Sequence, residues 1–465
     1  MENLNFEPLY KEIGTLNNLG LKNSSVPNSF YNSRLKGDYS NGRFGNVDYL
    51  NYLESRKLDP NGPLIKSVAK PLLLRLLNSA PGKIIISDTD GKTKILGQFK
   101  TPEINLKILD DEVFGLTLLN QSTGLGVAYA NGYFECDDLT QFLQLITKVL
   151  RKYTGTLNIL RTKTSVVGNK FRNLVHRQNK HVDRSQIHFH YDLSNEFFEL
   201  MLDNTMSYSC GIFLSPNDTL EAASINKIQN LVDMLELKPT DHLLEIGSGW
   251  GGLAMYAANS IGCNITTTTV SRQQELYVKQ KVKNCNLQDK VKVLDKDFRD
   301  LTGKFDKLVS VEMIEALDWT EHKMFLQKCA DLLKPGGKMA LQAIVHNDQT
   351  YERAKTRKDF IKSVVFPGGC LPSVSSILET TSKYTNLAIR KLEDIGIHYA
   401  NTLRGWQENL HSQNDRKISE LQHSGLVSSN PTFIRYWDFY LNYCRAGFLE
   451  KFVSDVQILF EKPAF

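Results

Sequence analysis

The sequence predicts an α/β protein in which a doubly wound parallel sheet is joined to a smaller N-terminal α+β domain. From Asp241 onward, apolar strand-like segments alternate with helical ones; the strands are expected at residues 243–246, 264–270, 291–294, 307–311 and 338–345. This alternation is typical of a parallel sheet that binds ligands at the carboxyl ends of its strands. A glycine-rich stretch directly follows the first strand. The chain of 465 residues also exceeds one typical core, so we expect two or three domains.

The glycine-rich stretch, residues 243–252, reads Leu-Leu-Glu-Ile-Gly-Ser-Gly-Trp-Gly-Gly. It predicts a buried strand, a tight turn and the start of a helix. Glycines allow positive φ and a close approach of the backbone to a ligand, while the N–H groups of the helix start face it. Gly247, Gly249 and Gly252 fit the dinucleotide fingerprint.

Two features favour a different nucleotide. The next strand end, residues 266–271, lacks the Asp or Glu that holds an NAD ribose. Glu245 stands two positions before the first glycine, where it can reach hydroxyls or an amino group of a ligand. The pattern is similar to the first motif of S-adenosylmethionine-dependent methyltransferases. A turn that binds no ligand is the less favoured alternative.

Composition limits the remaining classes. The seven cysteines are scattered and contain no C-x-x-C pair, which disfavours disulfides and zinc and fits a reducing compartment. The sequence shows neither a run of about 18 apolar residues nor a secretion signal, so we expect a cytoplasmic protein. The net charge of +5 permits contact with anionic lipid or nucleic acid without favouring either.

Residues 1–60 are rich in Asn, Ser and Gly and are predicted to be largely disordered. Residues 61–160 form the small domain, which contains no catalytic constellation. A helix over 65–77 is expected to kink or to begin at Pro71. Strands are expected at 83–87, 94–99 and 104–109, with Asp90-Gly91 as a hairpin turn, and a second helix at 139–150.

Residues 161–185 form a basic linker. The favoured interpretation is a solvated linker, and the alternative is a patch on anionic phospholipid, in which each basic residue contributes up to about 1 kcal/mol. Nucleic acid lacks support because the charges are not regularly interleaved with aromatic residues. After the linker, Ser215-Pro216 is expected to begin a helix; its inward-facing residues are Ile225, Ile228, Leu231 and Leu235.

Five segments together resemble the cyclopropane-fatty-acid synthases: His190-Tyr-Asp-Leu193, Met206-Ser-Tyr-Ser-Cys210, the stretch 245–252, Phe366-Pro-Gly-Gly-Cys-Leu-Pro-Ser373 and Tyr443-Cys-Arg-Ala-Gly-Phe448. The resemblance covers roughly residues 63–465. It implies a class I methyltransferase-like catalytic domain at 186–465 and a lipid-associated N-terminal domain. The implied enzyme is a cyclopropane-fatty-acyl-phospholipid synthase, which adds a methylene group from S-adenosylmethionine to a cis double bond of a phospholipid acyl chain. It would work as a peripheral protein at a membrane surface.

The chemistry of that reaction explains the residues it needs. An alkene is a poor nucleophile, so the sulfonium must present its methyl carbon in line and without water. The resulting carbocation must lose a proton and close to a ring, which calls for a dry site and one small base. Aromatic faces can stabilise the cation.

The resemblance implies that a bound bicarbonate is the base, held by a cysteine, a glutamate, a histidine and a tyrosine. These positions fall on Cys210, Glu315, Gln342 and Tyr399, with a further backbone contact from Ile344. Gln342 replaces the histidine; it can donate a hydrogen bond but cannot carry charge or a proton. If the missing imidazole limits proton removal, Gln342→His should raise the rate. Cys444 matches a second cysteine of suspected catalytic role, although this chemistry needs no thiolate.

The resemblance also places a set of residues around the cofactor: Tyr208 and Ser209 at its methionine end, Glu245, Gly247, Ser248, Gly249, Trp250 and Gly251 at the turn, Thr269, Val270 and Gln274 by the ribose, and Phe298 and Arg299 by the adenine. In isolation, several of these residues have a structural interpretation. A lone cysteine is more often a small buried hydrophobe, and Phe298 can be simple packing.

Two other functions compete with ring formation. One is methyl transfer that gives a methyl-branched lipid or a methylated small amine; the basic linker and the N-terminal domain favour lipid over amine. The other is a lipid-binding protein that has lost activity, suggested by Gln342 and opposed by the intact cofactor positions. The sequence leaves the double-bond position and the headgroup open, and is compatible with a monomer or a homodimer.

Overall fold

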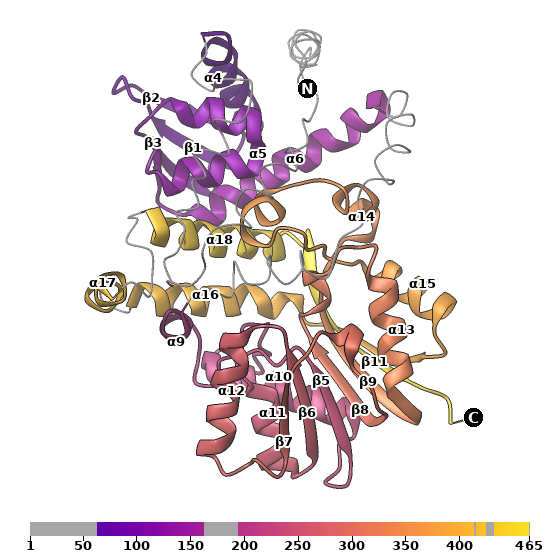
Figure 1. The fold of residues 1–465 in the computed structure, drawn as a ribbon. Coiled ribbons are helices and arrows are strands. Elements are labelled where there is room, and N and C mark those ends of the chain that lie inside the picture. Colours follow the sequence, from indigo (N-terminus) through magenta and orange to yellow (C-terminus); the bar gives the residue numbers. More distant parts are fainter. Residues whose placement is uncertain (1–62, 162–193, 413–414, 425–431, 465) are drawn as a thin grey trace, which may run out of the picture.

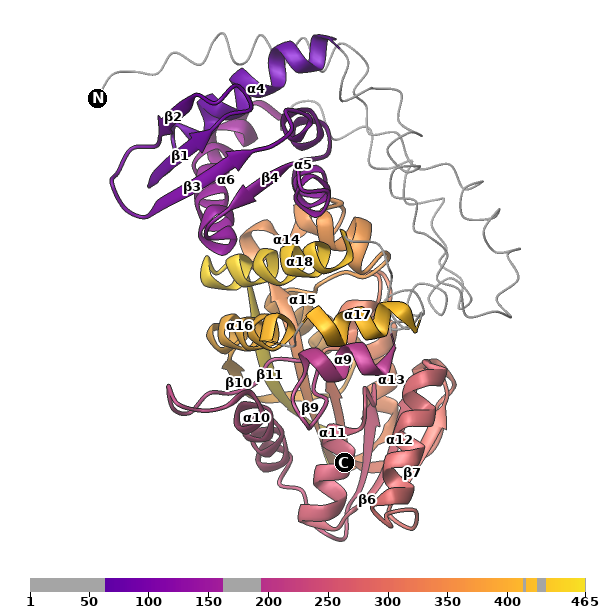
Figure 2. The same ribbon diagram turned by 90° about the vertical axis from the view of Figure 1, so that its left-hand side faces the viewer.

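The computed structural model describes residues 63–161, 194–412, 415–424 and 432–464. The predicted disordered N-terminus and nearly all of the basic linker lie outside this part of the chain. Two α/β layers are stacked on either side of a pair of long helices, α16 (Gly396–Ser412) and α18 (Thr432–Leu449), which lie between them in both views (Figures 1 and 2).

The larger layer is built on a sheet of seven strands in the order β10-β11-β9-β8-β5-β6-β7. Their bounds are β5 (His242–Ile246), β6 (Asn264–Thr269), β7 (Val291–Asp295), β8 (Phe305–Val311), β9 (Leu333–His346), β10 (Ala388–Asp394) and β11 (Val453–Glu461). The five predicted strands are all present, and β5 to β9 pair in parallel.

The parallel pairing of the predicted strands is confirmed, and one further strand departs from it. β11 runs antiparallel to both β9 and β10, with Val453 opposite His346 and Glu461 opposite Lys338. α18 ends at Leu449, near the carboxyl end of β9, so the chain re-enters the sheet from that end and must run back along β9. A single antiparallel strand near the edge of an otherwise parallel sheet is common.

The segment Pro335-Gly336-Gly337 lies inside β9. Phe305 of β8 pairs with Leu333, but Lys307 pairs with Lys338, so β9 contains extra residues at this point. Gly336 has a φ of 75°, which glycine adopts without steric cost. The segment is therefore a bulge within one strand.

Both faces of this sheet are covered, as the doubly wound fold requires. Neighbouring residues of β5 point to opposite faces: Leu243 packs in a core with α10 (Leu220–Leu235) and α12 (Arg272–Asn284), and Leu244 in one with α13 (His322–Leu332) and α15 (Val374–Tyr384). α10 begins at Leu220 rather than at Ser215-Pro216, because the Thr219 side chain caps it by accepting from the Ala222 N–H. Ile225, expected to face inward, is 37% exposed.

The smaller layer has the order β2-β1-β3-β4 in its sheet. Its elements are α4 (Pro63–Leu77), β1 (Lys83–Ser87), β2 (Thr93–Leu96), β3 (Glu103–Ile108), α5 (Glu112–Ala130), β4 (Phe134–Cys136) and α6 (Leu139–Arg161). The hairpin at Asp90-Gly91 is confirmed. α4 begins at Pro63 and continues past Pro71, so a start at Pro71 is wrong. α5 was not predicted, and it is interrupted at Gln121, whose φ is 54°.

α18 joins the two layers. The Tyr129 hydroxyl of α5 donates to Asp438 at 2.7 Å, and Thr140 of α6 donates to Asn442 at 2.5 Å. The ring of Phe439 packs 4.9 Å from Phe360. These contacts seat the N-terminal domain on the catalytic one, and their side chains share one hydrophobic core.

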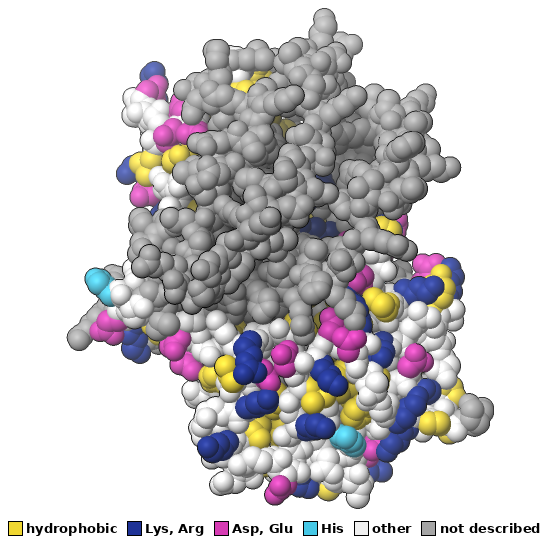
Figure 3. All heavy atoms as spheres, viewed as in Figure 1, with side chains coloured by type: hydrophobic (Ala, Val, Ile, Leu, Met, Phe, Trp, Pro, Cys, Tyr) yellow, Lys and Arg dark blue, Asp and Glu magenta, His cyan; other side chains and the backbone are white. Residues whose placement is uncertain are grey.

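The remaining described elements are short: α9 (Asn195–Met201), α11 (Gly252–Tyr256), η2 (Ala257–Ile261), η3 (Phe298–Asp300), η4 (Ile314–Ala316), α14 (Asp348–Ala354), η5 (Ile361–Val365) and α17 (Asp415–His423). None of the helices in the described residues has the length and apolar character to span a bilayer. On the described part of the catalytic domain visible in Figure 3, basic side chains are spread among apolar and acidic ones instead of forming one patch.

Candidate active site

The glycine turn has the predicted strand–turn–helix form. Gly247, Gly249 and Gly251 have φ values of 98°, 48° and 83°, a region that side chains disfavour. The N–H groups of Gly247 and Ser248 donate to the Thr268 carbonyl of β6 at 3.0 and 2.9 Å, which fixes the turn to the sheet. A Cβ built on Gly249 would meet no heavy atom within 4 Å. The turn thus leaves open space beside its backbone, as a nucleotide site requires.

Polar side chains predicted for the cofactor gather at the carboxyl ends of β5 and β6. Glu245 is buried and accepts from the Thr267 hydroxyl at 2.5 Å; burial raises the pKa of its carboxyl to about 8. The Thr269 hydroxyl donates to Oε1 of Gln274 at 2.9 Å, so the two side chains lie together at the end of β6. Val270 follows directly and is half-buried.

Phe298 and Arg299 lie in η3, after β7. The Arg299 guanidinium is held by Asp297 at 2.8 Å and by Glu321 at 2.5 Å, and it stacks 4.8 Å from the Phe298 ring. Phe298 is itself buried against Phe325. Phe298 therefore packs in the protein core, as its structural interpretation expects. Arg299 forms its ion pairs with two acids of the protein.

The residues predicted at the methionine end lie between the turn and the long helices. The Tyr208 hydroxyl is 2.9 Å from that of Tyr440, and Ser209 accepts from Lys227 at 2.9 Å. Trp250 is buried, and its indole N–H donates to Asn195 of α9 at 2.8 Å. This places an aromatic wall beside the turn, as a dry site for a cationic donor needs.

The acid–base residues converge on Glu312, which was not among the predicted site residues. Its Oε1 accepts from the Cys210 backbone N–H and from Nε2 of Gln342, both at 2.8 Å. Its Oε2 accepts from the Tyr399 hydroxyl at 2.6 Å. The structure thus brings three of the predicted residues together, and a fourth side chain at their centre holds them.

Gln342 links this carboxylate to the last strand. Its Nε2 also donates to Oδ2 of Asp455 at 2.8 Å, and its Oε1 accepts from Nε2 of Gln457 at 2.9 Å. Gln342 thus donates to an anion, as expected, and this anion is the Glu312 side chain of the protein itself. Asp455 and Gln457 were not predicted; both are completely buried in β11.

Glu315 lies beside this cluster and faces the cavity described below. Its Oε1 accepts from the Ile344 backbone N–H at 2.5 Å, so the expected backbone contact of Ile344 is present but goes to Glu315. Its Oε2 is buried without a hydrogen-bond partner. Burial and then the charge of Glu312 raise the pKa of Glu315 well above its usual range.

The three buried acids do not ionise alike. Burial raises the pKa of all three, and for Asp455 and Glu315 the charge of Glu312 raises it further. At Glu312, the hydrogen bonds from Tyr399 and Cys210 and the nearby Lys227 oppose the rise. We therefore assign the negative charge of the cluster to Glu312, because it has the most donors.

The backbone at Glu312 is unusual. Its φ of 47° lies in the left-handed region, which costs a non-glycine residue about 1–2 kcal/mol. Residues kept in such a conformation cluster at functional sites. The strain and the buried charge both indicate that the Glu312 side chain serves more than packing.

The two predicted cysteines are uncharged. Cys210 is completely buried, its thiol donates to the Gly211 carbonyl, and burial raises its pKa well above the usual value. It reaches the cluster through its backbone N–H. Burial also raises the pKa of the Cys444 thiol, and Asp359 adds to this effect. Neither environment provides a thiolate.

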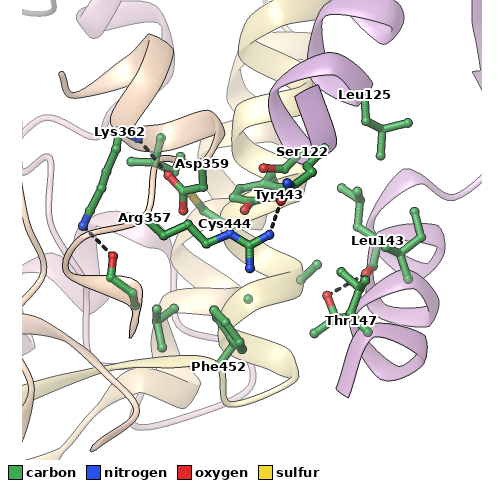
Figure 4. Close-up of a pocket in the computed structure, with 18 of the residues that line it drawn as sticks. Ser122, Leu125, Leu143, Thr147, Arg357, Asp359, Lys362, Tyr443, Cys444 and Phe452 are labelled. Carbon is green, nitrogen blue, oxygen red and sulfur yellow. Dashed lines mark hydrogen bonds between the residues drawn. The ribbon is translucent and has the colours of Figure 1, made fainter. Parts of the chain in front are cut away.

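Cys444 lies in the wall of a large cavity of about 1110 Å³, formed between the N-terminal domain, α18 and the loops of the catalytic domain. The wall is mainly apolar, with many Leu and Ile side chains, and it reaches Glu312, Glu315 and Tyr399. Figure 4 shows part of it: Arg357 and Asp359 lie close to Cys444 and Tyr443, and side chains of the N-terminal domain lie opposite, including Leu125, Leu143 and Thr147. An elongated apolar ligand would thus extend to the acid cluster.

Comparisons with known proteins agree with this arrangement. A family model described as mycolic acid cyclopropane synthetase matches residues 178–458. The tuberculostearic acid methyltransferase UfaA1 of Mycobacterium tuberculosis is 32% identical over 409 residues, which cover 86% of this chain and 92% of that protein. The cyclopropane-fatty-acyl-phospholipid synthase of Escherichia coli is 29% identical over 364 residues, covering 77% and 88%.

Among solved structures, the mycolic acid cyclopropane synthase CmaA1 with SAH and CTAB has a TM-score of 0.54 and 29% identity, over 60% of this chain and 98% of that one. The fold is that of the class I S-adenosylmethionine-dependent methyltransferases, and the protein is an enzyme of that class. Within the class, the chain belongs to the mycolic acid cyclopropane synthetase family. The predicted fold class and the predicted resemblance are confirmed.

Proposed function

We propose that this protein transfers a methylene group from S-adenosylmethionine to the cis double bond of an unsaturated phospholipid acyl chain and closes a cyclopropane ring. The observation that carries the proposal is the apolar cavity that extends from the N-terminal domain to the buried acid cluster. A small polar substrate would leave most of this apolar wall in contact with water, whereas an acyl chain would fill the cavity.

The cofactor side of the proposal rests on the turn at Gly247–Gly251 and on the polar groups around it. S-adenosylmethionine supplies an electrophilic methyl carbon and carries a positive sulfonium. Glu245, Thr269 and Gln274 offer acceptors and donors for its ribose. Tyr208, stacked 5.0 Å from Trp406, offers an aromatic face toward the cation. The residues present therefore fit the cofactor.

The lipid side rests on the composition of the cavity wall. Exposed Arg353, Arg357 and Lys358 line the same cavity as the apolar side chains of α4 to α6. Such an arrangement suits an anionic headgroup near the surface and an acyl chain inside. We therefore also propose that the protein works at a bilayer surface as a peripheral, cytoplasmic protein. It would act as a monomer or as a homodimer.

Proton removal is where this chain departs from the enzymes it resembles. The groups expected to hold bicarbonate, Cys210, Gln342 and Tyr399, already hydrogen-bond to a carboxylate of the protein itself. The residues present do not fit a second anion at this point, and the step is taken up in the next subsection.

A second function is methyl transfer to the same lipids with a methyl-branched product. The name of UfaA1, a tuberculostearic acid methyltransferase at 32% identity, favours it. Methylation of a small amine has no support from the apolar wall of the cavity.

The test is a substrate comparison. The purified protein is incubated with S-adenosylmethionine and vesicles of unsaturated phospholipid, and separately with the free fatty acid or a small amine. We expect a mass gain of one CH₂ in the phospholipid and cyclopropane proton signals in NMR spectra. Branched or alkenyl signals would favour the second function, and cofactor binding without any turnover would favour a lipid-binding protein.

A further inference from the structure

Three hydrogen-bond donors converge on one point of the active site. The Cys210 N–H and Nε2 of Gln342 meet Oε1 of Glu312 at 2.8 Å each, and the Tyr399 hydroxyl meets Oε2 at 2.6 Å. The donors come from three distant parts of the chain. They form a cradle for a planar anion with two oxygens, and Glu312 fills that cradle with a carboxylate.

An anion bound from solution would have no place here. A free bicarbonate in contact with the same donors would have to displace the Glu312 side chain or share a buried space with its charge. The charge of Glu312 already raises the pKa of the neighbouring Glu315 and Asp455. Like charges in a buried site are strongly disfavoured.

The backbone gives an independent indication. Glu312 has a φ of 47°, a conformation natural for glycine and strained for glutamate. Packing alone gives no reason to place a long acidic side chain at such a position. The side chain also lines the substrate cavity, within reach of a bound acyl chain.

We propose that Glu312 is a built-in general base that takes the place of bicarbonate. The inference rests on the proposed methylene transfer. The alkene forms a bond to the methyl carbon as the carbon–sulfur bond breaks, which leaves a cationic centre on the lipid and neutral S-adenosylhomocysteine. A C–H bond of the added group then breaks; its electron pair closes the ring, or forms a double bond, and its proton passes to the Glu312 carboxylate.

The raised pKa of Glu312 suits this role, because a buried carboxylate is a stronger base than one in water. Tyr399, Gln342 and the Cys210 N–H then act as positioning groups that fix both oxygens. Asp455 is joined to Glu312 through Gln342 and completes the support; burial and the charge of Glu312 raise its pKa.

The experiment uses buffers freed of carbon dioxide, with bicarbonate or formate added back. We expect the wild-type rate on lipid to be the same with and without bicarbonate. Glu312→Gln should lose at least about a hundredfold in kcat and recover nothing from either anion, because the amide still fills the cradle but takes no proton. Glu312→Gly relieves the backbone, empties the cradle and should regain activity when bicarbonate or formate is added.

Binding measurements provide a readout that does not depend on turnover. Calorimetry should show that the glycine variant binds formate and the wild type does not, while all variants bind S-adenosylhomocysteine alike. Glu379→Gln, an exposed acid on α15 paired with Lys383, is the matched control. A wild-type rate that rises with bicarbonate, a fully active Glu312→Gln, or formate binding to the wild type would overturn the inference. A wild type that makes no lipid product in any buffer would instead refute the proposed function, and the formate measurements would still decide whether the cradle is filled.

Discussion

The Tyr399 hydroxyl lies 2.6 Å from Oε2 of Glu312, although the two residues are 87 positions apart in the sequence. Tyr399 is carried by α16 and its ring stacks 4.4 Å from Phe448 of α18. Glu312 directly follows β8. The contact therefore connects the sheet of the glycine turn to the helices that line the large apolar cavity.

Gln342→His is expected to lower the rate, the opposite of the expectation from sequence. The Gln342 amide donates to two carboxyl groups and accepts from Gln457 at the same time. An imidazole has only two nitrogens and cannot reproduce this pattern. Steady-state kinetics should show a fall in kcat of about tenfold or more, with binding of S-adenosylhomocysteine unchanged. An equal or higher rate would show that Gln342 does not position Glu312.

Glu245→Gln should alter how stability depends on pH in the ligand-free protein. Burial raises the pKa of Glu245 from 4.5 to about 8, opposed by the Thr267 hydroxyl and by Lys227. A carboxyl whose pKa is raised by folding stabilises the protein below its unfolded pKa and loses that contribution as pH rises through the folded pKa. The wild-type melting temperature should therefore fall between about pH 5 and pH 8.

The variant lacks this titration, so its melting temperature should fall less over the same range. Glu315 and Asp455 also have raised pKa values and remain in both proteins, so the difference between the two curves isolates Glu245. If the melting temperatures of wild type and variant depended on pH in the same way, the pKa of Glu245 would not be raised by burial.

Gly251→Ala should weaken cofactor binding. Gly251 has a φ of 83°, and an added Cβ would lie 3.1 Å from Cγ1 of Val278 in α12, so the new side chain is both strained and crowded. Gly262→Ala is a matched control, because Gly262 has a φ of 79° but open space around it. Both variants should lose about 1 kcal/mol from backbone strain, but only Gly251→Ala should lose affinity for S-adenosylhomocysteine by calorimetry. Equal affinities would show that the turn does not hold the cofactor.

Arg357→Ala should raise the KM for anionic phospholipid about fivefold and leave kcat nearly unchanged. Arg357 is exposed, lines the cavity and donates to Gln121 of α5, so it stands where a headgroup would enter. The difference from wild type should shrink in high salt, because exposed charges are screened. Arg390→Ala, on the β10 edge and paired with Glu461, is the control and should behave as wild type. If Arg357→Ala and Arg390→Ala changed the KM for anionic phospholipid equally, Arg357 would not be part of a headgroup site.

The strands of the parallel sheet were predictable because they are short runs rich in apolar or β-branched residues, as in β5 and in the four threonines of β6. β10 and β11 were not predicted. β10 is largely exposed and rich in charges, and β11 contains the polar residues Asp455 and Gln457 at completely buried positions. Both side chains hydrogen-bond to Gln342, and a partner so distant in the sequence cannot be read from a local pattern.

The candidate site shows the same limit. Glu312 stands three positions before Glu315 in the same motif, and only long-range contacts with Cys210, Gln342 and Tyr399 distinguish the two. The one local signal was an additional acid within the motif Val311-Glu-Met-Ile-Glu315. The glycine turn, in contrast, was found at once, since its conformation restricts which residues can stand there.

In the proposed reaction, a carbon from S-adenosylmethionine is added to a lipid double bond and loses one proton to the protein. The most direct measurement uses S-adenosylmethionine whose methyl group carries three deuterons, with unsaturated phospholipid vesicles and mass spectrometry of the product. We expect a lipid that keeps two of the three deuterons, with ring signals in its NMR spectrum. A product that keeps all three deuterons, or lipid without any label while the cofactor is consumed, would contradict it.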